Sequence, residues 1–318
     1  MKPVLFFGEA LYDCFLDSDG TQRDELPGGS ALNAAVGAAR LEIPVAFSGG
    51  IGGDAHGQAL LRLMDREKIG RRYVFYKKDL PTTTSQVRQS AQGEPSFAFH
   101  RSGCADEAVT VDDVADIDPR AFSALHCAGV MLASEPGASA QEALVKKFYD
   151  AGVPVSFDLN ARPALVKEKQ RYCQRALQLM LKSQLAKFST DDLLWFFPDE
   201  DVNTGFAALC QARRGALTVM TAGVQGSLIA SGGVCERLYA YSVDVVDATG
   251  CGDGYAAGLI HGLLRLPEGT PWDGLTSEQV RWIGSGASAV AARVCQKRGA
   301  IAAMPRLSDV FSPQGTSQ

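Results

Sequence analysis

Apolar residues along this chain gather in short runs that alternate with longer segments of helical spacing. Short apolar, β-branched runs bounded by turn residues are typical of buried strands, and apolar residues every three or four positions predict amphipathic helices. The alternation predicts an α/β fold. The predicted strands are residues 3–8, 44–50, 124–130, 153–157, 185–188, 217–221, 227–230 and 243–246, and the predicted helices are 31–41, 58–67, 138–150, 168–183, 201–213, 256–263 and 277–297.

Residues 73–101 break this rhythm. Three short alternating runs, 73–76, 82–89 and 96–101, are separated by polar turns. This spacing predicts antiparallel hairpins rather than βαβ units. A small antiparallel patch within an α/β protein is typical of a lid or a subdomain, and its exposed edges favour pairing with another strand. We therefore predict a homodimer formed through the lid.

The segment from Asp244 to Leu264 carries the strongest chemical signal. A β-branched run, Asp247 and a glycine-rich turn at 250–254 lead into an apolar helix. Such a turn aims the unpaired N–H groups of a helix N-terminus at one point, which favours a phosphate. Asp253 lies in the same turn, where its charge would repel the phosphate. It is either an N-cap of the helix or a base that takes the proton of an attacking hydroxyl, and the turn alone leaves both interpretations open.

Polar residues also follow the first strand and open the next helix. Glu9 and Asp13 lie at a strand exit, where open α/β sheets bind ligands, so they are candidates for sugar hydroxyls or a metal. The Gly28-Gly29 pair permits close backbone approach, and we expect Ser30 to be the N-cap. Asn33 is a poor helix former in the first turn, which suggests a use for its amide.

Further candidates lie in the second half of the chain. Arg162 follows a strand and is suited to clamping a phosphate or a carboxylate. Ser189 and Asp192 have the spacing of a capping box, which accounts for both without any ligand. The turn 221–227 places two glycines after a strand, near the expected nucleotide. In the last helix, small residues at 284–292 would let a flat ligand lie close.

One glycine pattern is misleading. Residues 50–55 match the dinucleotide pattern G-x-G-x-x-A after a strand. That pattern also requires an acid about twenty residues further on. Arg71, Arg72 and Tyr73 occupy that place, so we do not expect a nicotinamide or flavin site.

Composition narrows the class of protein. The 318 residues are 46% hydrophobic and 21% charged, which is ordinary for a soluble protein. A formal net charge of −5 without Lys/Arg clusters argues against a nucleic-acid partner. No apolar run approaches the length of a membrane span, and the N-terminus does not resemble a signal peptide. The eight cysteines show no paired zinc-ligand spacing. We expect reduced thiols in a cytoplasmic protein.

Several catalytic motifs are missing from the sequence. It contains no Gly-Lys dipeptide, so it has no Walker P-loop, and H-R-D, G-x-S-x-G and H-E-x-x-H are also absent. The four histidines are scattered. Any phosphoryl transfer must therefore use a different cradle for the phosphates.

Taken together, the two glycine motifs resemble those of the ribokinase, or PfkB, family of carbohydrate kinases. Residues 28–33 through 50–57 resemble its first motif, and residues 247–253 (DATGCGD) resemble its second, D-T-x-G-A-G-D. The resemblance extends from residues 8–13 to 299–305 and so covers nearly the whole chain. It implies one domain, residues 1–318, folded as a three-layer α/β/α sandwich with a small β-sheet lid at about 12–27 and 73–103.

The resemblance also implies a site, with ATP as donor and Mg²⁺ as helper. Asp253 matches the general base, and the N–H groups of Gly250, Cys251 and Gly252 match the anion hole. The sugar is expected at Asp13, Gly28, Gly29 and Asn33. Apart from the resemblance, we assign Arg162 to the phosphoryl group and Arg101 to the sugar, although either could bind a sugar hydroxyl, a carboxylate or the transferring phosphate, and the sequence does not decide between these. The nucleotide is expected at Ser189, Asp192, Thr221, Gly223, Gly226 and Ser288, with Asp192 acting indirectly on Mg²⁺. Family members often bind a monovalent cation near this turn, so Asp247 and Thr249 are candidate K⁺ ligands.

This sequence departs from the family pattern at several positions. Cys251 replaces an alanine of the anion hole. Ser189 and Asp192 replace the usual Asn and Glu, which predicts weaker contact with the metal or contact through water. Residues 8–13, 97–106 and 158–163 look like fructokinases, and 2-keto-3-deoxygluconate kinases share the first and last of these.

We therefore predict an ATP-dependent kinase for the terminal hydroxyl of fructose, with a 2-keto-3-deoxygluconate kinase or another PfkB sugar kinase as the alternative. A non-catalytic sugar or nucleotide sensor on the same fold is the alternative of a different class.

Overall fold

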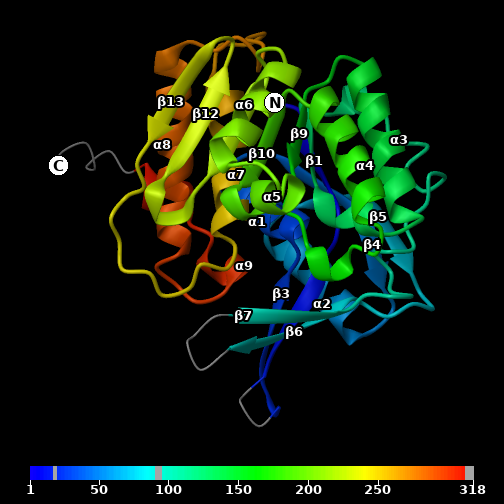
Figure 1. The fold of residues 1–318 in the computed structure, drawn as a ribbon. Coiled ribbons are helices and arrows are strands. Elements are labelled where there is room, and N and C mark those ends of the chain that lie inside the picture. Colours follow the sequence, from blue (N-terminus) through cyan, green and yellow to red (C-terminus); the bar gives the residue numbers. More distant parts are fainter. Residues whose placement is uncertain (17–19, 90–94, 312–318) are drawn as a thin grey trace.

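A nine-stranded sheet forms the centre of the computed structural model, which describes residues 1–16, 20–89 and 95–311 (Figure 1). The strands lie in the order β13-β12-β11-β10-β9-β8-β1-β4-β5. Pairing is parallel from β11 to β5, whereas β12 and β13 add an antiparallel edge. The strand bounds are β1 Val4–Phe7, β4 Val45–Gly52, β5 Gly70–Lys77, β8 Ala124–Ala128, β9 Val155–Asp158, β10 Leu185–Ser189, β11 Leu217–Thr221, β12 Ser227–Ser231 and β13 Val234–Leu238.

Helices cover both faces of this sheet and bury its apolar residues in two cores. In β1, Phe6 packs with one core and Phe7 with the other, because neighbouring strand residues point to opposite faces. The sheet and its two helical layers form the predicted three-layer sandwich. On one face lie α1 Ser30–Arg40, α2 Ala55–Arg66, α7 Cys251–Arg265, α8 Ser277–Val294 and α9 Ala300–Ala303; on the other lie α3 Gly137–Asp150, α4 Lys169–Lys182, α5 Thr190–Phe196 and α6 Val202–Ala212; α10 Leu307–Val310 follows near the C-terminus.

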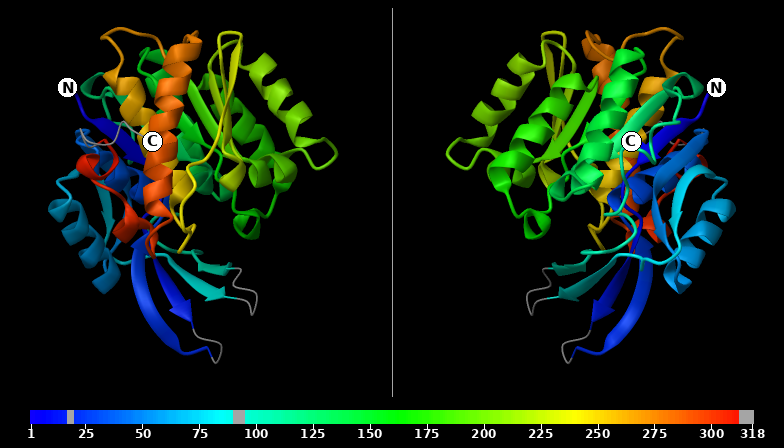
Figure 2. Two further views of the ribbon diagram at one scale, coloured as in Figure 1. Left: turned by 90° about the vertical axis from the view of Figure 1, so that its left-hand side faces the viewer. Right: turned by 90° about the vertical axis from the view of Figure 1, so that its right-hand side faces the viewer.

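A small sheet projects from one end of this body (Figure 2). Its order is β3-β2-β6-β7, from β2 Leu11–Leu16, β3 Gln22–Gly28, β6 Thr84–Gln89 and β7 Pro95–His100. The strand β2 continues directly from the end of β1, so the small sheet lies at the carboxyl edge of the large one. That edge is where open α/β sheets bind ligands.

The structure corrects the predicted elements at two places. The run 73–76 belongs to β5, which pairs parallel to β4 in the large sheet, so the second lid segment begins at β6 rather than at Tyr73. Residues 243–246 form no strand; Val245 and Val246 are exposed, and the antiparallel strand β13 precedes them instead. A β-branched run is a strand only where a neighbouring strand pairs with it. The tail beyond 311, predicted to fray, lies outside the described residues.

The misleading glycine pattern at 50–55 has a packing explanation. A Cβ on Gly50 would lie 1.9 Å from the carbonyl oxygen of Ala105, and one on Gly53 would lie 1.9 Å from that of Lys78. These glycines therefore let neighbouring segments of the protein itself approach the end of β4. Among the described residues, no helix is long and apolar enough to cross a membrane.

Candidate active site

Helix α7 begins in a turn that requires glycine. Its N-cap, Gly250, has φ +80°, and a Cβ there would lie 2.6 Å from the Cβ of Ala300. Cys251 N–H donates to the carbonyl of Ala248 at 3.2 Å, and the first bond within the helix runs from Gly254 N–H to Gly250 at 2.8 Å. The N–H groups between them, on Gly252 and Asp253, are thus left for an anion.

Asp253 does not cap the helix. It is the third residue of α7, and its carboxylate accepts hydrogen bonds from helix α1 instead. Ser30 Oγ donates to Oδ1 and Asn33 Nδ2 donates to Oδ2, both at 2.8 Å. Of the two interpretations open from the sequence, the geometry favours the base, because a fixed carboxylate is aimed across the end of the sheet rather than at its own backbone.

Burial raises the pKa of Asp253, although hydrogen bonds from Asn33 and Ser30 and the charges of Lys187 and Arg162 oppose the shift. The residue is 7% exposed. A carboxylate with a raised pKa is a stronger base than an exposed one. This is the property that proton transfer from an alcohol needs.

Two partners of Asp253 were not predicted from the sequence. Ser30 was expected to be an N-cap, but Gly29 holds that position with φ +102°, which frees the Ser30 hydroxyl for Asp253. Asn160 Nδ2 donates to Ser30 Oγ at 2.5 Å and lies 3.5 Å from Asp253 Oδ1. Asn160 has φ +34°, a conformation that asparagine tolerates better than most residues. A non-glycine residue with this conformation often marks a functional site, but it leaves no signal in the sequence.

The predicted sugar-binding residues gather around this carboxylate. A Cβ on Gly28 would lie 2.6 Å from Asp13 Oδ2, and one on Gly29 would lie 2.6 Å from the carbonyl of Glu9, so the glycine pair is needed for close approach. Burial raises the pKa of Asp13 to about 6, and the charges of Arg162 and Asp253 also act on it. Asn33 thus contacts Asp253 directly, and the charge of Arg162 acts on both Asp13 and Asp253. Arg162 itself donates to the carbonyl of Ala161 at 3.0 Å.

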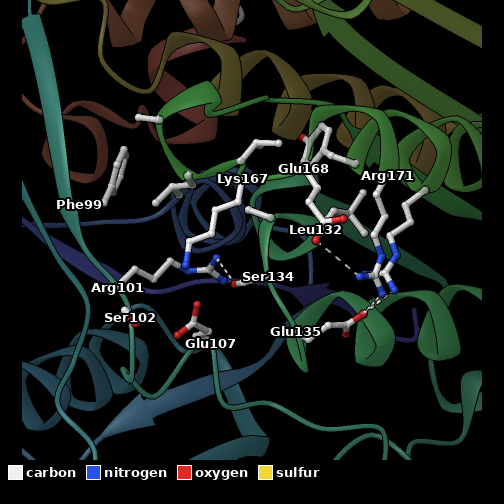
Figure 3. A pocket seen from close by; sticks show the side chains of 16 residues that line it. Phe99, Arg101, Ser102, Glu107, Leu132, Ser134, Glu135, Lys167, Glu168 and Arg171 are labelled. Atoms are coloured by element: carbon white, nitrogen blue, oxygen red, sulfur yellow. Dashed lines mark hydrogen bonds and ion pairs between the residues drawn. The ribbon is translucent and has the colours of Figure 1, made fainter.

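Arg101 is held differently from the other predicted sugar contacts. Its guanidinium donates to Asp106 at 2.7 Å, to the Val130 carbonyl at 3.3 Å and to Ser134 Oγ at 3.2 Å, which ties the end of β7 to the segment that follows β8. It also lines a cavity of about 490 Å³ between the lid and helix α4 (Figure 3). The role of Arg101 in reading the sugar stays a prediction.

A second cavity, of about 460 Å³, ends at the glycine turn. It brings together four residues predicted to bind the nucleotide, from the end of β11, the turn after it and helix α8. Gly226 has φ +89°, and a Cβ there would lie 1.9 Å from the carbonyl of Leu238, so this turn also requires glycine. The lining includes Thr221, Gly223, Gly226 and Ser288 together with Cys251 and Gly252.

The comparisons with known proteins agree with this geometry. The family model described as "pfkB family carbohydrate kinase" matches residues 1–307. The chain belongs to the PfkB family of carbohydrate kinases.

Several relatives of this PfkB kinase are fructokinases. A fructokinase of Rhizobium leguminosarum bv. trifolii is 32% identical over 82% of this chain and 79% of its own length. One of Escherichia coli is 30% identical over 95% and 96%. Among solved structures, a fructokinase of Vibrio cholerae O395 with fructose, ADP and potassium bound has a TM-score of 0.86 at 25% identity, covering 98% of this chain and 97% of its own. A fructokinase of Xylella fastidiosa with bound ATP has the same TM-score and identity, over 98% and 97%.

The capping box of the kinase is complete. Ser189 caps α5, and Asp192 Oδ2 accepts from Ser189 N–H and Oγ, both at 2.8 Å. Asp192 Oδ1 accepts from Ala161 N–H at 2.8 Å. Asp192 therefore fixes the segment that carries Asn160 and Arg162. Neither Ser189 nor Asp192 lines the nucleotide cavity, so their predicted contact with the nucleotide stays a prediction.

Asp247 and Thr249 organise the loop before α7. Asp247 Oδ1 accepts from Thr249 N–H at 2.9 Å, and Oδ2 accepts from Gly299 N–H at 2.8 Å. Burial raises the pKa of Asp247, but these hydrogen bonds outweigh it and the net shift is downward. An ionised carboxylate beside the glycine turn suits a monovalent cation.

The thiol of Cys251 lies in the nucleotide cavity together with that of Cys295. Burial raises the pKa of Cys251, and the neighbouring Cys295 thiol adds to the shift. A thiol with a raised pKa is a poor nucleophile and a poor metal ligand. The N–H of Cys251 donates to Ala248, so its part in the anion hole stays a prediction. Its side chain adds a small apolar surface to the cavity.

Proposed function

We infer that this kinase transfers the γ-phosphoryl group of ATP to the terminal hydroxyl of fructose. One observation carries the inference: a buried carboxylate, Asp253, lies in the first turn of the helix at which the nucleotide cavity ends. The fructokinase names of the relatives, and the fructose, ADP and ATP bound in the solved structures, support the choice of substrates.

The chain supplies three elements of the reaction. Asp253 takes the proton of the sugar hydroxyl as its oxygen bonds to the γ-phosphorus and the bond to the leaving ADP oxygen breaks. The N–H groups at the start of α7 stabilise the charge on the transferring phosphoryl group. Arg162, whose charge already acts on Asp13 and Asp253, adds a cation on the sugar side.

A coupled assay of ADP release with a panel of sugars tests this function. Fructose should give the highest kcat/KM. A preference for 2-keto-3-deoxygluconate would select the alternative acceptor. Binding of sugar or nucleotide without turnover on any acceptor would identify a sensor and contradict the proposal.

Below pH 6, kcat/KM for fructose should fall by about tenfold per pH unit, because protonation removes a catalytic or sugar-binding carboxylate. The pKa of Asp13 is raised to about 6 and that of Asp253 is also raised, mainly by burial. The charges of Asp253 and Arg162 act on Asp13, and those of Lys187 and Arg162 act on Asp253. An acid with a raised pKa loses its charge as the pH falls through that pKa, so the acid limb should lie above the usual carboxylate range. A pH profile with its limb near 4 would contradict the assignment.

The contribution of Asp13 to the free energy of unfolding should change with pH in the opposite direction to kcat/KM, and decrease as the pH rises. Folded Asp13 binds its proton more tightly than unfolded Asp13, so its contribution becomes less favourable as the pH rises from about 4 to about 6.

We propose Mg²⁺ as the metal that accompanies the nucleotide, where it would screen the phosphate charges. The described residues hold no cluster of three or more His, Cys, Asp or Glu side chains placed for a metal. This fits an ion held mainly by phosphates and water, with Asp192 acting through water. K⁺ at Asp247 and Thr249 belongs to the same proposal, supported by the potassium in the Vibrio cholerae fructokinase.

Two substitutions in the capping box separate its structural role from an effect on the metal. Ser189→Ala and Asp192→Asn both weaken the box, which should cost about 1 kcal/mol of stability each. Only Asp192→Asn removes a charge, so it alone should raise the Mg²⁺ concentration that gives half-maximal activity. Equal Mg²⁺ curves for the two variants would remove Asp192 from the metal assignment.

The predicted homodimer through the lid is kept as a proposal. The small sheet ends in the edge strands β3 and β7, and edge strands favour pairing. Light scattering coupled to gel filtration should give twice the mass of the chain, and a monomer would contradict the proposal.

A further inference from the structure

A buried lysine lies beneath the glycine turn. Lys187 is in β10, and its side chain is 6% exposed. Its ammonium is 2.7 Å from Asp158 Oδ2, at the end of the neighbouring strand β9. A buried ammonium is costly unless it is paired, so its position calls for an explanation.

The ammonium of Lys187 faces the turn where the phosphoryl group is expected. A Cβ built on Gly252 would lie 3.4 Å from Lys187 Nζ, with no other atom of the described residues within 4 Å outside the chain neighbours and the helix backbone. Among the described residues, Lys187 Nζ is therefore the atom that a Cβ at residue 252 would contact. The absence of a side chain at Gly252 leaves the ammonium directly behind the backbone of the turn.

Three buried acids surround the same cation. Asp158, Asp192 and Asp253 are 1%, 8% and 7% exposed. Burial lowers the pKa of Lys187, but the charges of these three acids outweigh it, so the net shift is upward and the ammonium stays charged. Lys187 in turn is one of the groups that oppose the upward shift of the Asp253 pKa. Even without a phosphoryl group, the three carboxylates Asp158, Asp192 and Asp253 share the one ammonium of Lys187.

Bringing a transferring phosphoryl group to this cluster adds further negative charge beside Asp253. The sequence has no Walker lysine to balance it. We propose that Lys187, anchored by Asp158, is a positioning residue for phosphoryl transfer, whose ammonium behind Gly252 balances the charge that the phosphoryl group brings to Asp253. This inference rests on the proposed kinase activity and adds a residue that acts through the turn and the base.

The test removes both charges of the pair so that neither is left buried alone. Asp158→Leu/Lys187→Met replaces the pair with apolar side chains of similar volume, which often preserves stability. We expect a folded protein in which kcat falls about tenfold or more, while KM for ATP stays near the wild-type value. That loss is smaller than the loss expected for a donor in direct contact with the phosphoryl group. A merely structural pair would instead leave kcat unchanged, and that result would overturn the inference.

A matched control applies the same exchange elsewhere. The Lys77–Asp113 pair has a similar separation, 2.8 Å, and is only partly buried. Asp113→Leu/Lys77→Met should keep the wild-type kcat. An equal loss of kcat in this control would show that the exchange acts through stability, which would also contradict the inference.

Two further measurements keep the inference testable if the first double variant folds poorly. Asp158→Asn keeps the ammonium and an oxygen to hold it but removes the charge of its anchor, and should lower kcat by a smaller factor; an unchanged kcat would contradict the role of the charged anchor. Binding of ADP with aluminium fluoride, a mimic of the transferring phosphoryl group, should weaken in Lys187→Met while binding of ADP alone is kept. Failure of the proposed function is seen separately, as a wild-type protein without turnover. In that case unaltered binding of ADP–aluminium fluoride by Lys187→Met would contradict the inference on its own.

Discussion

Asp253→Asn should lower kcat by about 10²–10⁴-fold, the usual contribution of a positioned general base. The amide has nearly the same shape as the carboxylate, so it fills the space between Ser30 and Asn33 without a cavity. It cannot accept the hydroxyl proton. Binding of ATP should persist, because the residues lining the nucleotide cavity are unchanged. Steady-state kinetics together with calorimetry of ATP binding measure the two effects separately.

The control for this variant is an Asp→Asn exchange outside the site. Asp113 accepts from Lys77 Nζ and Thr110 N–H, both at 2.8 Å. Asp113→Asn removes a paired carboxylate of the same kind and should keep wild-type turnover. A kcat of Asp253→Asn close to that of the wild type would contradict the assignment of the base.

The residues of the reacting centre that could be predicted from the sequence are those whose signal is local. The turn 250–254 contains its glycines and its acid within five positions, so its chemistry is visible in one segment. The nucleotide turn 221–226 is local in the same way. Both lie at one cavity in the structure. Their agreement with a family pattern then fixed the fold over nearly the whole chain.

The hydrogen-bond partners of Asp253 are far from it in the sequence. Asn33 and Asp253 are separated by 220 positions, and Ser30 and Asp253 by 223. Nothing within the segment around Ser30 distinguishes a hydroxyl that caps a helix from one that donates to a distant carboxylate. In the structure Gly29, with φ +102°, occupies the N-cap position, so the Ser30 hydroxyl is the one that donates to Asp253.

Strand assignments were wrong where pairing rather than composition decides the structure. The run 243–246 has strong β propensity but no partner strand. The strand β13 includes charged residues and yet pairs with β12. Residues 73–76 were assigned to the lid by their alternation, yet they extend the large sheet beside β4. In both cases the tertiary context outweighed the local propensity.

Gly250→Ala should have the second large effect, on both stability and turnover. The left-handed φ of +80° costs a non-glycine residue about 1–2 kcal/mol. The new Cβ would also lie 2.6 Å from the Cβ of Ala300, and such overpacking costs about 1–3 kcal/mol. Either the turn or residue 300 must move. The proposed function assigns the phosphoryl charge to the N–H groups at the start of α7, so kcat should fall by about 10²–10³-fold.

The two costs of Gly250→Ala can be measured separately. Gly269 has a similar φ, +83°, and a Cβ there would meet nothing within 4 Å, so Gly269→Ala carries the conformational cost alone. It should lose about 1–2 kcal/mol in chemical denaturation and keep its turnover. Adding Ala300→Gly to Gly250→Ala removes the contact with the Cβ of residue 300 but leaves a contact of 2.8 Å with its Cα, so it should restore only part of the stability lost to overpacking. If part of the turnover also returns, the contact with the Cβ displaced the turn; if only stability returns, the conformation of residue 250 and its remaining contact with the backbone set the direction of the N–H groups. A Gly250→Ala variant with wild-type turnover would show that the start of α7 does not hold the phosphoryl group.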